Sequence, residues 1–164
     1  MKVTDSEFAE CFKQHLARLV AIGVATSGDA EVARDLAQET FLRLHRHWDR
    51  LDDRDDVGGW LTRVMANLLI DHHRSKASER RAAERLASRA EGAVAEGEPA
   101  ALGRWAALVA PLPARQRLIV ALHYGDDRSI SEIAELLGVS PNTVKSALSK
   151  AREALRERGG IDAY

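Results

Sequence analysis

Cysteine, aromatic residues and long apolar runs are all scarce in this 164-residue sequence. Its one cysteine, Cys11, excludes an internal disulfide and fits a reducing compartment. Aromatic residues make up 5% of the chain, so a core must come mainly from Leu, Val, Ile and Ala, as in packed helices. No stretch approaches about 18 uninterrupted apolar residues, and the first residues are too acidic for a secretory signal. These absences predict a soluble, cytoplasmic, all-α protein without a membrane span.

The first half of the chain has the periodicity of amphipathic helices. Apolar residues recur at the spacing of one buried helical stripe in three segments, 8–23, 32–48 and 60–69. The stretch LVAIGVA (19–25) also fits a strand, but a lone strand would have no pairing partner, which favours the helix. Asp29 is the expected N-cap of the second helix, the acidic stretch 49–59 is an expected loop, and the third helix is expected from Trp60 into DHHRSK.

The composition then changes between Ser75 and Gly103, where large apolar residues nearly vanish among Ala, Glu, Arg and Gly. This stretch predicts a flexible linker, with helix at its start, between two small helical domains. The expected boundaries are an N-terminal domain at 1–76, a linker at 77–103 and a C-terminal domain at 104–164. In the C-terminal domain we expect Pro113 in the first turn of a helix over 114–124, then a turn at 125–129 and a helix over 130–137.

The end of the chain has the pattern of a helix-turn-helix. Ala134 is small enough for a close helix crossing, Gly138 tolerates positive φ in the turn, and Ser140 and Pro141 fit the start of the second helix. That helix has an apolar stripe of Val144, Leu148, Ala151 and Leu155. Its opposite face carries side chains suited to base edges and phosphates: Asn142, Thr143, Lys145, Ser146, Ser149 and Lys150. The alternative is an ordinary helical hairpin with a solvated face, and repressors, response regulators and initiation factors all share this unit.

The formal net charge of −1 conceals segments of opposite sign. Cations outnumber carboxylates over 62–81 and 141–158, whereas carboxylates outnumber cations over 28–39 and 126–135. Basic faces in both predicted domains suit phosphate, and acidic ones suit a different partner. A solvated acidic loop remains an alternative for the stretch 49–56.

Three blocks, in this order, resemble the extracytoplasmic-function (ECF) sigma factors of bacterial RNA polymerase. They are DAEVARDLAQETFLRLHRHW (29–48), GWLTRVMANLLIDHHR (59–74) and LPARQRLIVALHYGDDRSISEIAELLGVSPNTVKSALSKAREALRE (112–157). The resemblance covers nearly the whole chain except the linker. It implies a transcription initiation factor whose partners are core RNA polymerase, through the coiled coil of its largest subunit and its flap region, promoter DNA and an anti-sigma factor.

The resemblance also implies a division of labour. The polymerase-binding residues would be Asp35, Gln38, Glu39, Leu42 and Arg43. The minus-ten element would be bound by Asn67, Asp71, His72 and Arg74, with an extruded base held in a pocket. Independently of the resemblance, the cations Arg63, Arg74 and Lys76 suit the phosphates of the single strand at this element. The exposed face of the helix-turn-helix described above would read the minus-thirty-five element.

Two features set this sequence apart within that resemblance. Trp48 and Trp60 are in phase with the buried stripes, so no aromatic residue is left as a stacking platform, which predicts weak melting and strict promoters. Arg34 stands where the family usually has an acidic residue, and Ala147 stands where it often has arginine. The second departure removes a cation from the DNA-facing side, so another member's promoter sequence does not transfer.

The remaining classes fit less well. The pairs His45/His47 and His72/His73 lack the i, i+4 spacing of helical metal ligands, and no nucleophile and base pair or glycine-rich phosphate loop occurs. We therefore expect no metal, no cofactor and no enzymatic activity. A stand-alone transcriptional regulator and a protein-interaction module remain as rivals, although the first domain lacks the alternating strands and helices of a receiver domain.

Overall fold

The computed structural model describes residues 5–51, 56–84 and 100–157, and all of its regular elements in these ranges are helical. The N-terminal part consists of α1 (Asp5–Ser27), α2 (Ala30–His47), a short 3-10 helix η1 (Trp48–Arg50) and α3 (Val57–Glu84). The C-terminal part consists of α4 (Ala100–Val109), α5 (Ala114–Val120), η3 (Ala121–Gly125), α6 (Ile130–Leu137) and α7 (Pro141–Glu157). The all-α prediction is confirmed, and LVAIGVA lies within α1 as a helix.

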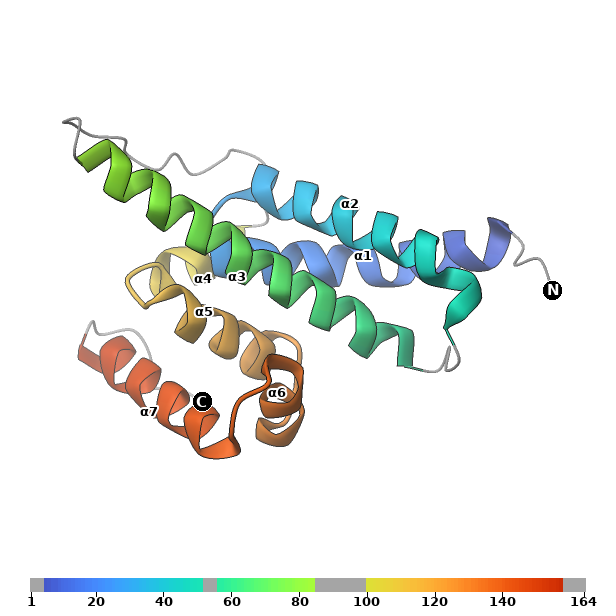
Figure 1. Ribbon diagram of the computed structural model, residues 1–164. Helices are drawn as coiled ribbons and strands as arrows, with labels where there is room; N and C mark the ends of the chain where they lie inside the picture. The colour runs from blue at the N-terminus through green and yellow to red at the C-terminus, as the bar shows by residue number, and fades with distance from the viewer. Residues whose placement is uncertain (1–4, 52–55, 85–99, 158–164) are drawn as a thin grey trace.

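The N-terminal part is a bundle in which α1, α2 and α3 all pack on one another (Figure 1). Asp29 caps α2 as expected, because its carboxylate accepts hydrogen bonds from the backbone N–H groups of Glu31 and Val32 at 2.9 and 3.2 Å. Gly23 allows α1 and α2 to approach closely. A Cβ atom at that position would lie 2.7 Å from the Ala33 Cβ.

Three expected boundaries differ from the observed ones. Helix α3 begins at Val57 rather than Trp60, so the end of the predicted loop 49–59 is helical, and residues 52–55 lie outside the described ranges. It also continues past Lys76 to Glu84, because the stretch KASERRAAE is rich in the helix formers Ala, Glu, Arg and Lys, and this confirms the helix expected at the start of the linker. Helices therefore extend into both ends of the predicted linker, whose residues 85–99 lie outside the described ranges.

Pro113 was expected in the first helical turn, and this is wrong. It occupies the N-cap position of α5 with φ −54° and ψ 147°, an extended conformation that turns the chain into the helix. The expected helix 114–124 also changes form at Ala121, where η3 is a turn of π-helix closed by the Asp126 N–H on the Ala121 carbonyl at 3.1 Å. The π turn is followed directly by the turn that holds Asp126.

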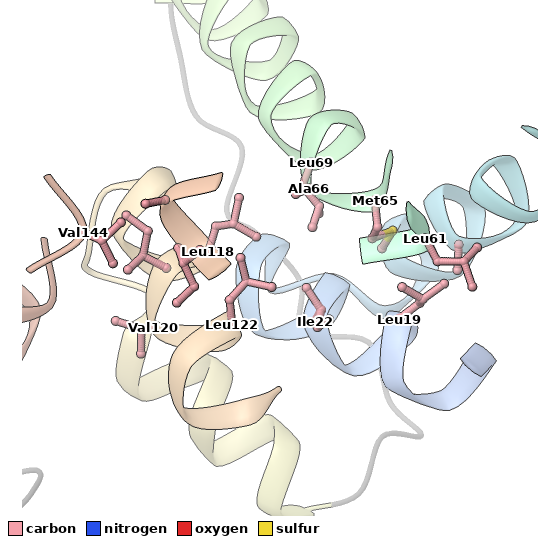
Figure 2. Packing of buried hydrophobic residues seen from close by; sticks show 14 of the residues in the cluster. Leu19, Ile22, Leu61, Met65, Ala66, Leu69, Leu118, Val120, Leu122 and Val144 are labelled. Atoms are coloured by element: carbon pink, nitrogen blue, oxygen red, sulfur yellow. The ribbon is translucent and has the colours of Figure 1, made fainter. Parts of the chain in front are cut away.

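One apolar core runs through both parts of the chain. Helix α1 packs on α4, α5 and η3, and α3 packs on α5 and α6. In Figure 2, Ile22 from α1 and Leu122 from η3 are among the buried side chains where the two parts meet, with Leu69 and Leu118 in the same cluster. Figure 1 shows the C-terminal helices against one flank of the bundle. The two predicted domains are therefore in contact in this structure.

Candidate nucleic-acid interface

The turn between α6 and α7 has the conformation that a helix-turn-helix needs. Ser129 and Glu132 form a capping box at the start of α6, with hydrogen bonds of 3.1 and 2.7 Å. The Ser129 backbone N–H, and then the Ser129 side chain, lower the pKa of the Glu132 carboxyl. Gly138 ends α6 with φ 64°, the left-handed conformation expected for it. Ser140 then accepts a hydrogen bond from the Thr143 N–H at 3.2 Å, which caps α7.

Helix α7 has two opposite faces. Its inward stripe is almost fully buried, with exposed fractions of 0–2% for Val144, Leu148, Ala151 and Leu155. The face predicted to bind DNA is exposed at every one of its positions: Asn142, Thr143, Lys145, Ser146, Ser149 and Lys150. Ala147 lies at the edge of this face, partly buried against the core. The structure thus leaves the polar face open while the apolar face holds α7 on α5 and α6.

The structure adds two residues that the sequence reasoning missed. A groove between the start of α5 and the start of α7 is lined by Arg115 and Gln116 on one side and by Asn142, Thr143, Ser146 and Lys150 on the other. Arg115 is exposed, so its guanidinium extends the basic surface beyond α7. The available signal was a basic residue in the first turn of the helix before the motif, which is too common to single out one residue.

The residues predicted to bind the minus-ten element lie on two faces of α3. At about 100° per residue, Arg63, Asn67, Asp71 and Arg74 fall within one quadrant, and all four are exposed. His72 and Lys76 point to the other side of the helix. Burial and then the Lys76 ammonium lower the pKa of His72, whereas the nearby Asp29 carboxylate raises it. The structure therefore brings four of the six candidates together and separates two.

The predicted polymerase-binding residues share the outer face of α2. Leu42 is 54% exposed, an unusual position for a large apolar side chain, and the Arg43 Nε donates to the Glu39 carboxylate at 2.9 Å. Gln38 and Asp35 are exposed on the same face, about one and two turns before Leu42. The opposite side of α2 is held in the core by Ala37, Phe41 and Leu44. This face therefore presents one large apolar side chain, Leu42, beside the Glu39–Arg43 ion pair.

Trp48 and Trp60 differ in their burial. Trp48 is 8% exposed and lies in the core, as expected. Trp60 is partly buried against the same cluster, with its ring 6.0 Å from that of His47. Neither tryptophan is a fully exposed platform on the α3 face.

Among the described residues, no group of three or more His, Cys, Asp or Glu side chains is placed to hold a metal ion. No helix of the described ranges is long and apolar enough to cross a membrane.

Comparison with known proteins agrees with this arrangement of helices. Residues 11–79 match the family described as sigma-70 region 2, and residues 102–155 match sigma-70, region 4. The fold is similar to that of the sigma factor RpoE in its complex with the anti-sigma factor NepR from Bartonella quintana. That comparison has a TM-score of 0.75 and 23% identity over 96% of this chain and 99% of that chain. The fold and its two regions define a sigma factor.

Relatives in sequence narrow the class. The chain is 30% identical to the ECF RNA polymerase sigma factor SigW of Bacillus subtilis over 80% of this chain and 77% of the relative. It is 33% identical to the ECF RNA polymerase sigma factor SigL of Mycobacterium tuberculosis over 88% of this chain and 84% of the relative. The chain belongs to the ECF sigma factors of RNA polymerase. Its function is transcription initiation, in which it binds core RNA polymerase and directs it to specific promoters.

Proposed function

We propose that three exposed faces divide the work of this sigma factor. The outer face of α2, with Leu42 at its centre, binds the coiled coil of the largest polymerase subunit. The face of α3 that carries Arg63, Asn67, Asp71 and Arg74 contacts the minus-ten element, and α7 reads the minus-thirty-five element. Residues 1–76 and 104–164 are the two functional domains, and 77–103 connects them through the polymerase.

The observation that carries this proposal is the two-faced character of α7. Each of its six candidate DNA-binding residues is exposed, while the four apolar residues between them are at most 2% exposed. A helix held on one side in this way presents short hydrogen-bonding groups and two cations to a groove of the duplex without unfolding. Arg115, across the groove from Lys150, is placed to hold a phosphate at the edge of the same site.

Among its described residues, helix α3 offers cations for duplex opening but no exposed aromatic side chain on which a base could stack. Arg63 and Arg74 are exposed cations that suit single-stranded phosphates, but Trp48 is buried in the core. We propose that this factor melts DNA weakly and depends on promoters close to its preferred sequence. His72 and Lys76, on the other side of α3, contribute to the minus-ten site less than the other four residues do.

A protein that restrains this factor is part of the proposal. Two similar structures are complexes, RpoE with the anti-sigma factor NepR and CnrH with the cytosolic domain of CnrY. An anti-sigma factor that covers the α2 face would compete directly with polymerase. The proposed location is the cytoplasm, where polymerase acts, and the proposal assigns the chain no catalytic activity, metal or cofactor.

The test is reconstituted initiation. Purified chain is mixed with core polymerase and a library of promoter fragments, and run-off transcripts are sequenced. We expect transcripts that start downstream of one pair of elements and require the chain. Sequence-specific binding to duplex DNA without polymerase, together with no run-off transcript in its presence, would support a stand-alone regulator instead.

A further inference from the structure

A short ion pair between described residues joins the N-terminal and C-terminal parts. Arg18 on α1 donates through Nη1 to both carboxylate oxygens of Asp126, at 2.9 Å each. The same nitrogen donates to the Thr62 hydroxyl at 2.9 Å, and Nη2 donates to the Gly58 carbonyl at 3.2 Å. The Asp126 side chain is only 4% exposed, so the contact is largely removed from water.

Each partner in this ion pair has a second partner within its own part of the chain. Arg18 is held by Thr62 and Gly58 at the start of α3, and Asp126 also accepts from the Arg128 Nε at 2.9 Å. If the two parts separate, neither the guanidinium nor the carboxylate is left without a hydrogen bond. Breaking a buried charge pair is costly mainly when it strands one charge, and this arrangement avoids that cost. The contact is therefore built to open reversibly.

The other end of the same interface is repulsive. Arg117 on α5 faces Arg80 and His73 on α3, and burial, followed by the charge of Arg80, lowers the pKa of the Arg117 guanidinium. In the described part of the chain, the Arg117 Nε has no hydrogen-bond partner. Electrostatic attraction across this interface is thus concentrated at Arg18 and Asp126, beside apolar contacts such as those of Ile22 and Leu122.

In the closed arrangement, with the N-terminal and C-terminal parts packed together, one molecule cannot contact both promoter elements at once. The centres of the minus-ten and minus-thirty-five elements are about 25 base pairs apart, which is about 85 Å at roughly 3.4 Å per base pair. In this structure α3 packs on α5 and α5 packs on α7. Two such steps at about 8–10 Å each place the axes of α3 and α7 only about 20 Å apart. The two DNA-binding faces must separate before one molecule contacts both elements.

We infer that the Arg18–Asp126 ion pair, braced by Thr62, is a latch that keeps the free chain closed and opposes promoter recognition until polymerase separates the two parts. This inference rests on the proposed assignment of α3 and α7 to the two promoter elements. Polymerase binds the open form, and only a fraction of the free molecules is open. The apparent affinity for polymerase is therefore the intrinsic affinity multiplied by that open fraction. Weakening the latch therefore raises apparent activity at low concentration.

The test compares Arg18→Gln, Asp126→Asn and the double variant with the wild type. There are two control variants. Lys13→Gln removes another exposed cation of α1, and Asp127→Asn changes the exposed neighbour of Asp126. The first measurement is the concentration of chain that gives half-maximal run-off transcription with core polymerase. We expect it to fall about three- to tenfold in each latch variant, to fall no further in the double variant, and to stay unchanged in both controls.

The second measurement is Förster transfer between dyes at position 10 in α1 and position 153 in α7 of the free chain, in a Cys11→Ala background. Transfer should fall in the latch variants and stay at the wild-type level in the controls, without any need for polymerase. Unchanged transfer and an unchanged half-maximal concentration in Asp126→Asn would overturn the latch. Absence of transcripts from the wild type would instead contradict the proposed function, and the transfer measurement would still decide the latch.

Discussion

His73 on α3 lies beside Arg117 on α5, and within the described residues neither the imidazole Nε2 nor the guanidinium Nε has a hydrogen-bond partner. Burial, then the charges of Arg117 and His72, lower the pKa of His73, and Arg80 acts in the same direction. The Thr26 backbone, which is hydrogen-bonded to the imidazole, raises it. The causes that lower the pKa of His73 outweigh the one that raises it, at a position where the two parts of the molecule meet.

The first prediction is that the closed form loses stability as the pH falls. A histidine whose folded pKa lies below its usual value of 6.5 is protonated more readily in the unfolded or open chain. Stability is therefore unaffected well above 6.5 and decreases as the pH falls below it. Urea unfolding at pH 7.5 and 5.5 measures this change, and His73→Gln should reduce it. The exposed His45→Gln is the control, and an equal pH dependence in His73→Gln and wild type would contradict the prediction.

His15 and His72 contribute to the same pH dependence. Burial is the first cause of the lowered pKa at both positions, followed by Arg18 for His15 and Lys76 for His72. The His73→Gln variant is therefore expected to reduce the acid sensitivity rather than abolish it.

The sequence was most informative where one local signal has one physical meaning. Asp29, Gly138 and Ser140 were predicted to cap or end helices, and all three do so, because capping depends on a few neighbouring backbone groups. The stripe of α7 was equally predictable, since periodicity alone defines it. Pro113 was misplaced by one position, because its fixed φ suits both the N-cap and the first turn.

The contact between the two parts could not be predicted in this way. Arg18 and Asp126 are 108 positions apart, and nothing in their own surroundings identifies one as the partner of the other. The division of the α3 candidates has a simpler origin. His72 was carried over with the motif and Lys76 was chosen for its charge, whereas a helical projection places both away from Arg63 and Arg74. The roles of all these site residues remain predictions.

The second prediction concerns the two lysines of α7. Lys145→Ala and Lys150→Ala should each weaken binding of the polymerase complex to the minus-thirty-five element about fivefold, because each removes one cation from the exposed face. If a lysine contacts phosphate, the slope of log affinity against log salt should also fall by about 1. The matched control is Arg152→Ala, because Arg152 is an exposed cation on another side of α7, where it lines a pocket with Trp105 and Tyr124. A loss of polymerase affinity in the lysine variants would refute their assignment to DNA.

The third prediction concerns the exposed leucine of α2. Leu42→Ala should lower the affinity for core polymerase about tenfold while leaving the melting temperature almost unchanged, because the side chain is 54% exposed in the free protein. Affinity is measured with labelled chain and core enzyme. Binding of a minus-thirty-five duplex by preformed complexes, compared at equal occupancy, should stay the same. Lys13→Ala on α1 provides a surface control, and an equal loss of affinity in both variants would contradict a specific role for the α2 face.

The fourth prediction tests the turn that orients α7. Gly138 has φ 64°, and although a Cβ at this position would meet no other atom, an L-residue there is strained by about 1 kcal/mol. Gly138→Ala should therefore lower the free energy of unfolding by about that amount in urea titrations, and Gly138→Asn should lower it less, because asparagine tolerates the left-handed region. Gly125→Ala is the matched control, since Gly125 also has open space around its Cβ position but no positive φ. The Gly138 variants should weaken minus-thirty-five recognition only as far as they unfold the motif, because the proposed assignment gives the base contacts to α7 and not to the turn. A large loss of DNA binding in a fully folded Gly138→Asn protein would show that the turn itself touches DNA.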